Sequence, residues 1–115
     1  MQNVTELKSI IKNATSSEGF PVRFVSIKDD PDVYGDATES NYLPVVIGNP
    51  PINMFLEINT TDDGVVEYHY EVIFNGDIVG EDNSSFDDAD AEQEIRSVVR
   101  ELKNHINTGR SSMSL

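Results

Sequence analysis

The sequence predicts an α+β protein, with an antiparallel sheet of four to five strands and an N-terminal and a C-terminal helix packed on one face. Helical patterns lie at both ends of the chain, and short strands separated by tight turns lie between them. Tight turns join antiparallel neighbours, because a parallel crossover needs a dozen or more residues. The 115 residues are 37% hydrophobic, which is typical of one globular domain. We therefore assign residues 1–110 to a single acidic domain and expect 111–115 to form a frayed tail.

The first helix is predicted over residues 4–14. Asn3 and Glu6 have the spacing of a capping box, and apolar residues then recur at helical spacing, at Val4, Leu7, Ile10, Ile11 and Ala14. The segment 16–19, Ser-Ser-Glu-Gly, is expected to end the helix. β-Branched and aromatic residues then predict a strand over 21–28.

Two further strands follow an acidic loop over 29–41, which Pro31 and Gly35 interrupt. The apolar run 43–47 predicts a strand, and because Pro44 cannot donate to a ladder, we expect that strand at an edge. Residues 52–59 predict its neighbour.

The clearest strand is predicted over 65–74. Its residues alternate strictly, so one face should pack on the core and the face with Glu67, His69 and Glu71 should meet water. Asp63-Gly64 before it and Asn75-Gly76 after it are hairpin turn signals, and the second leads into a short strand over 77–79.

The last helix begins after Ser84 and Ser85, which are candidate N-caps, with Phe86 as a hydrophobic staple. Its acids come first and its bases later, which suits the helix dipole. Gly109 is the expected stop. Its apolar stripe consists of Ala91, Ile95, Val98, Val99, Leu102 and Ile106.

Charge is distributed unevenly along the chain. The formal net charge is −13, no Lys or Arg occurs between Asp29 and Ile95, and 18 of the 21 acids lie from Asp29 to Glu94. A broad negative potential of this kind repels nucleic-acid phosphates and attracts basic partners. We therefore expect a basic protein partner and no direct nucleic-acid binding. Solubility or adaptation to a salty cytoplasm would give the same composition.

Several classes of function lack a signature. The chain has no cysteine, so it offers no thiolate nucleophile or zinc–sulfur site. It also has no Gly-x-Ser-x-Gly elbow and no phosphate-binding loop. Apolar runs are too short for a membrane span, and the N-terminus lacks the layout of a secretory signal. We expect a cytoplasmic protein with no enzymatic activity, no cofactor and no membrane contact.

Two groups of residues could hold a metal. Glu67, His69 and Glu71 project from one strand face, where they could ligate a divalent ion or instead form a solvated surface. The segment 30–36 matches the first, third and sixth positions of an EF-hand loop. Tyr34 lacks a suitable oxygen at the fifth position, and Asn41 stands at the twelfth, where a bidentate Glu belongs.

The leading hypothesis is a non-catalytic acidic protein that docks on a basic partner, in its sharper form as a nucleic-acid mimic that inhibits a DNA- or RNA-binding protein. One alternative is a small chaperone or assembly factor that grips an apolar client segment with Phe55, Val65 and Ile73. The other is a metal-dependent hydrolase using Glu67, His69 and Glu71. The residues predicted to bind the basic partner are Asp29, Asp30, Asp32, Asp36, Asp62, Asp63, Glu67, Glu71, Glu81 and Asp82. The oligomeric state stays open.

Overall fold

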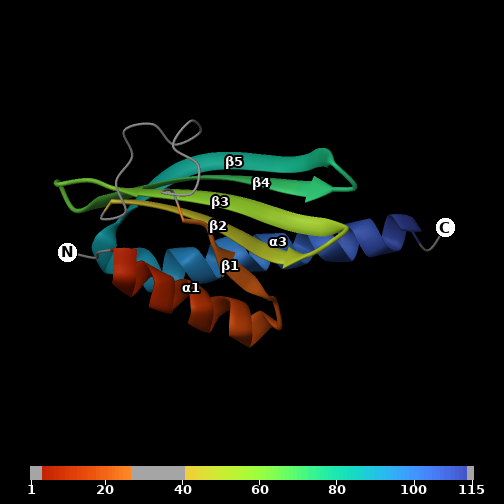
Figure 1. The fold of residues 1–115 in the computed structure, drawn as a ribbon, viewed down its shortest axis with the longest axis horizontal. Helices are drawn as coiled ribbons and strands as arrows, with labels where there is room; N and C mark the ends of the chain where they lie inside the picture. Colours follow the sequence, from red (N-terminus) through yellow and green to blue (C-terminus); the bar gives the residue numbers. More distant parts are fainter. Residues whose placement is uncertain (1–3, 27–40, 114–115) are drawn as a thin grey trace.

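A computed structural model of the chain describes residues 4–26 and 41–113, with side chains described as far as residue 107. It confirms the predicted α+β class: five strands form one antiparallel sheet in the order β1-β2-β3-β4-β5, with a helix at each end of the chain (Figure 1). The elements are α1 (Val4–Glu18), β1 (Val22–Phe24), β2 (Tyr42–Asn49), β3 (Ile52–Thr60), β4 (Val65–Phe74), β5 (Asp77–Asp87), the 3₁₀ turn η2 (Asp88–Asp90) and α3 (Ala91–Met113).

The two helices pack against each other on one side of the sheet (Figure 1). Leu7 and Ile11 of α1 and Val99 and Leu102 of α3 are fully buried, as the predicted apolar stripes require. At the end of α1, Lys103 Nζ donates to Glu18 Oε2 at 3.0 Å across the helix pair. Within the described ranges, no helix has the length and apolar character needed to cross a bilayer.

The strands bury one face and leave the other polar. In β3, Ile52, Met54, Leu56 and Ile58 are buried, while the residues between them are half-exposed. In β4, Val66, Tyr70 and Val72 are buried on the same side. The predicted alternation of residues 65–74 is therefore confirmed, with the apolar face toward the helices.

The edge position predicted for Pro44 is wrong. β2 lies between β1 and β3, and Pro44 is paired with Glu57 of β3. The Pro44 carbonyl accepts a hydrogen bond from Val25 N at 3.0 Å. In a strand, the nitrogen and the carbonyl of one residue point the same way, so the nitrogen of Pro44 also faces the β1 side, just beyond the end of β1. The missing N–H therefore costs the sheet no bond between β2 and β3.

The short final strand predicted over 77–79 is also wrong, because β5 continues to Asp87. Ser84 and Ser85 lie in β5, paired with Tyr68 and Glu67, and are not N-caps of the helix. Phe86 is a buried core residue opposite Val66. Pairing with the long β4 strand outweighs the low strand propensity of this polar segment.

Three other element ends differ from the predictions. β1 has three residues, Val22–Phe24, where a longer strand was expected. α1 continues to Glu18, and the hydroxyls of Thr15 and Ser17 donate to the carbonyls of Ile11 and Asn13, at 2.8 and 3.0 Å. α3 continues past Gly109 to Met113, because a single glycine inside a helix costs only about 1 kcal/mol.

Gly80 allows α3 to approach the end of the sheet closely. A Cβ atom at this position would lie 2.6 Å from Cε1 of the His105 ring. The glycine therefore makes room for the imidazole, which packs directly over the backbone of β5.

Candidate functional site

The sheet surface turned away from α1 and α3 is a broad polar face that extends over several strands. We call it the outer face. It consists of the even-numbered residues of β2, the odd-numbered residues of β3 and β4, and the odd-numbered residues of β5 from Glu81 to Asp87. β1 contributes Arg23, which is paired with Val46.

Three cross-strand rows place the polar side chains of this face. Asn59, Glu67 and Ser85 form one row across β3, β4 and β5. The next two rows are Glu57, His69 and Asn83, and then Phe55, Glu71 and Glu81. Neighbours in a row have Cβ atoms about 5 Å apart, and successive rows are about 7 Å apart.

Four glutamates on three adjacent strands make the outer face acidic: Glu57, Glu67, Glu71 and Glu81. Glu67 and Glu81 are exposed, and Glu57 and Glu71 are half-exposed. Among the described residues of this face, Arg23 is the one Lys or Arg, and it lies on the far edge strand. The negative charge of Glu67, Glu71 and Glu81 is therefore not offset by a Lys or Arg on the described parts of their own or adjoining strands.

A shallow depression of about 510 Å³ lies over two of these rows. Glu57, Glu67 and His69 line it, together with the polar side chains of Asn59 and Asn83. It therefore offers two carboxylates and several hydrogen-bonding groups to anything that enters it.

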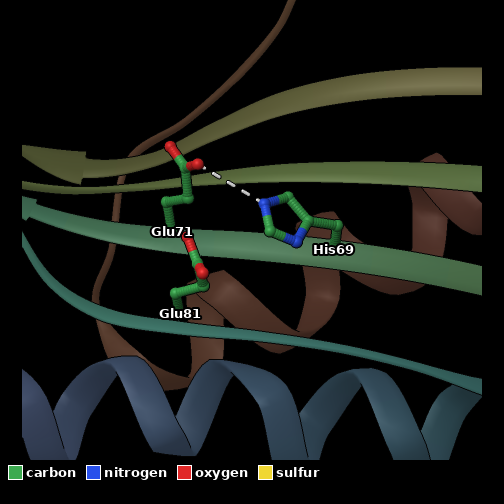
Figure 2. Close-up of side chains that lie close together, drawn as sticks. All are labelled: His69, Glu71 and Glu81. Atoms are coloured by element: carbon green, nitrogen blue, oxygen red, sulfur yellow. Dashed lines mark hydrogen bonds and ion pairs between the residues drawn. The ribbon is translucent and has the colours of Figure 1, made fainter.

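His69, Glu71 and Glu81 gather beside the depression (Figure 2). His69 Nε2 lies 3.4 Å from Glu71 Oε1, and one ligand atom from each of the three residues lies within 4.8 Å of the others. The side chains of His69 and Glu71 are 36% and 30% exposed, so solvent reaches the group.

The opposite face of β4 carries a different polar contact. The hydroxyl of Tyr70 donates to Glu101 Oε2 of α3. Burial, followed by this hydrogen bond and the negative charge of Glu101, raises the pKa of Tyr70. Burial and the charge of Glu101 likewise raise the pKa of Tyr68. Both phenols are therefore held neutral between the sheet and α3.

The predicted partner-binding residues fall into several places. Glu67, Glu71 and Glu81 share the outer face, and Asp62 and Asp63 are exposed in the turn between β3 and β4. Asp82 pairs with Tyr70, so it belongs to the helix side of β5. The remaining predicted residues, Asp29, Asp30, Asp32 and Asp36, lie outside the described residues, as does most of the EF-hand-like segment 30–41.

Two features of the face were not predicted. Glu57 lies beside His69, and the alternation of Ile52, Met54, Leu56 and Ile58 was the signal that could have placed it there. Glu81 joins the cluster of His69 and Glu71 in the place that Glu67 was expected to take. Its position depends on the register of β5, which the sequence does not fix.

The predicted apolar patch is only partly brought together. Phe55 and Ile73 are near each other, because Phe55 pairs with Glu71. Val65 lies at the other end of β4, about 27 Å from Ile73 by strand rise. The structure adds Ile78, opposite Ile73, and Val79, which are 55% and 51% exposed.

Comparisons with protein-family models, curated proteins and solved structures found no match to this chain.

Proposed function

We propose that the protein is a non-catalytic binding protein whose outer face docks on a basic surface of a partner protein. The observation that carries this proposal is the placement of Glu57, Glu67, Glu71 and Glu81 on one face of three adjoining strands. Helix dipoles and capping explain acids at helix ends, but they do not explain four glutamates on a sheet.

The geometry suits recognition of basic side chains. The strands hold the carboxylates at fixed spacings, so little conformational entropy is lost from the backbone when a partner docks. The depression bounded by Glu57 and Glu67 can accept one Lys or Arg head, with Asn59 and Asn83 as additional hydrogen-bond partners. Complementary charge also accelerates encounter at low salt.

In the sharper form of the proposal, the surface of the partner on which the protein docks is one that otherwise binds nucleic acid. Such a surface arranges Lys and Arg to neutralise phosphates. Carboxylates presented in rows on a sheet can occupy the same basic groups. Nucleic acid and the protein would then compete for one partner.

The test compares capture by three forms of the full chain from nuclease-treated lysate of its source. These are the wild type, the outer-face variant Glu57→Gln/Glu67→Gln/Glu71→Gln, and the control Asp77→Asn/Asp90→Asn/Glu92→Gln, which loses the same charge elsewhere. We expect the wild type and the control to retain the same basic protein and the outer-face variant to lose it. Release at moderate salt and by a random-sequence oligonucleotide is expected, because screening weakens such contacts.

Equal capture by all three forms would show that the outer face is not the docking surface. Equal loss from both variants would mean that only total charge matters. If an excess of oligonucleotide does not release the captured protein, the nucleic-acid-mimic form of the proposal is wrong, but docking on a basic partner still stands.

Exposed apolar residues at the β4–β5 hairpin favour one alternative, a chaperone that binds an apolar client segment. Ile78 and Val79 are more than half exposed and adjoin Ile73. Binding through this patch should survive high salt and be lost on Ile78→Ser/Val79→Ser. The same salt series therefore separates the two functions.

A further inference from the structure

Glu71 and Glu81 face each other directly across β4 and β5. Like charges at directly opposed positions destabilise a sheet. Glu71 is also half-buried, which lessens the screening of its charge by water. The fold therefore places two carboxylates where a positive charge between them would be favourable.

The described residues supply little positive charge at this point. Along the row of Glu71, the first basic residue is Arg23, three strands away and about 14 Å distant by strand spacing. His69 is the nearest group that can become positive or act as a ligand. Its Nε2 lies 3.4 Å from Glu71 Oε1, which is beyond the usual range of about 2.7–3.2 Å for an N–H···O hydrogen bond.

That separation matches two ligands of one metal ion. Zinc lies about 2.0–2.1 Å from a histidine nitrogen and about 2.0–2.2 Å from a carboxylate oxygen, so two such ligands at a tetrahedral angle are about 3.4 Å apart. The third ligand atom, from Glu81, is within 4.8 Å of the other two. Figure 2 shows Glu81 extending toward Glu71 and the Glu71 carboxylate turned to the His69 ring.

We propose that His69, Glu71 and Glu81 bind one divalent transition-metal ion, with zinc as the preferred ion. One imidazole and two carboxylates form a ligand set suited to zinc, whereas calcium and magnesium favour oxygen ligands alone. Two paired strands hold the three side chains, and the partial exposure of the group leaves room for water to complete the coordination. The ion neutralises the Glu71–Glu81 pair.

The test is calorimetric titration of the full chain with zinc chloride, after treatment with a chelator. We expect one ion per chain, and at least tenfold weaker binding on His69→Ala and on Glu81→Gln, because each removes a ligand. Two controls should bind as the wild type does. Glu67→Gln removes an outer-face carboxylate outside the cluster, and His105→Ala removes the other histidine.

The site would be overturned by no zinc binding to the wild type, by wild-type affinity in both His69→Ala and Glu81→Gln, or by an equal loss of affinity in Glu67→Gln. An equal loss in Glu67→Gln would mean that zinc is attracted diffusely by the acidic outer face and not held by the three ligands. Calcium or magnesium binding equal to that of zinc would also contradict the imidazole as a ligand. The outer-face variant removes Glu71, which both proposals use, so the two are separated by His69→Ala and Glu81→Gln. Neither change is part of the outer-face variant, and each should weaken zinc binding whether or not the chain captures a basic partner.

Discussion

The two faces of β4 differ in almost every property although their residues alternate along one strand. Val66, Tyr70 and Val72 are buried against the helices, whereas Glu67, His69 and Glu71 remain accessible. On the helix side, burial of apolar area stabilises the fold. On the outer side, the acidic rows contribute little to packing and include an opposed like-charged pair. The contacts that stabilise the fold and the surface that we propose for docking therefore lie on opposite faces of the same strand.

The largest test of this contrast compares two adjacent residues of β3. Leu56 is 2% exposed, between Val45 and Tyr70 in the sheet, and Glu57 is its half-exposed neighbour on the outer face. Leu56→Ala should lower the free energy of unfolding by about 3 kcal/mol, because it removes buried methyl groups and leaves a cavity. Glu57→Ala should change it by less than about 0.5 kcal/mol.

Urea unfolding followed by circular dichroism measures both changes. The slope of the free energy against urea should match the wild type in each variant. Similar losses for the two substitutions would mean that the outer face also stabilises the fold, and the division of roles would be wrong.

This contrast was the part of the fold that the sequence predicted well. The alternation over 65–74 and the apolar stripes of the helices depend on local periodicity, which can be read from the order of the residues. The length of β5 could not be predicted, because Gly80 to Ser85 have low strand propensity and gain their structure by pairing with β4. The edge position predicted from Pro44 was wrong for a related reason. Whether its missing N–H costs the sheet a hydrogen bond depends on where β1 ends, which is a long-range feature.

The candidate site was likewise predicted only where it depends on one strand. Glu67, His69 and Glu71 were placed on one face because they belong to one strand. Glu57 and Glu81 join them only through the registers of β3 and β5, which are long-range pairings. The sequence therefore placed Glu67, His69 and Glu71 on one polar face but did not bring Glu81 together with His69 and Glu71.

A smaller effect is expected from the polar contact on the helix side. Tyr70→Phe removes the hydroxyl that donates to Glu101, so the free energy of unfolding should fall by about 1 kcal/mol at pH 7. Folding raises the pKa of Tyr70 above its ordinary value of 10.0. The unfolded chain then releases this proton first, and stability that is present below pH 10 is lost as the pH rises further.

The measurement is a series of urea unfolding curves from pH 7 to pH 11. Tyr70→Phe should begin less stable than the wild type but lose stability less steeply above pH 10. An unchanged alkaline slope would mean that ionisation of the phenol is not linked to folding. Equal stability of the two forms at pH 7 would mean that the contact with Glu101 does not stabilise the fold.

The smallest effect should have the opposite sign and lie on the outer face. Glu81→Gln removes one charge from the opposed Glu71–Glu81 pair and leaves the His69–Glu71 contact in place. In the presence of a chelator and at low salt, the free energy of unfolding should rise by about 0.2–1 kcal/mol. Salt at 1 M should remove most of the gain, because the Debye length then falls to about 3 Å. Destabilisation by Glu81→Gln under the same conditions would show that the outer face stabilises the fold through its glutamates. An increase that persists in high salt would trace the gain to strand propensity, and the pair would no longer explain why a cation is favoured there.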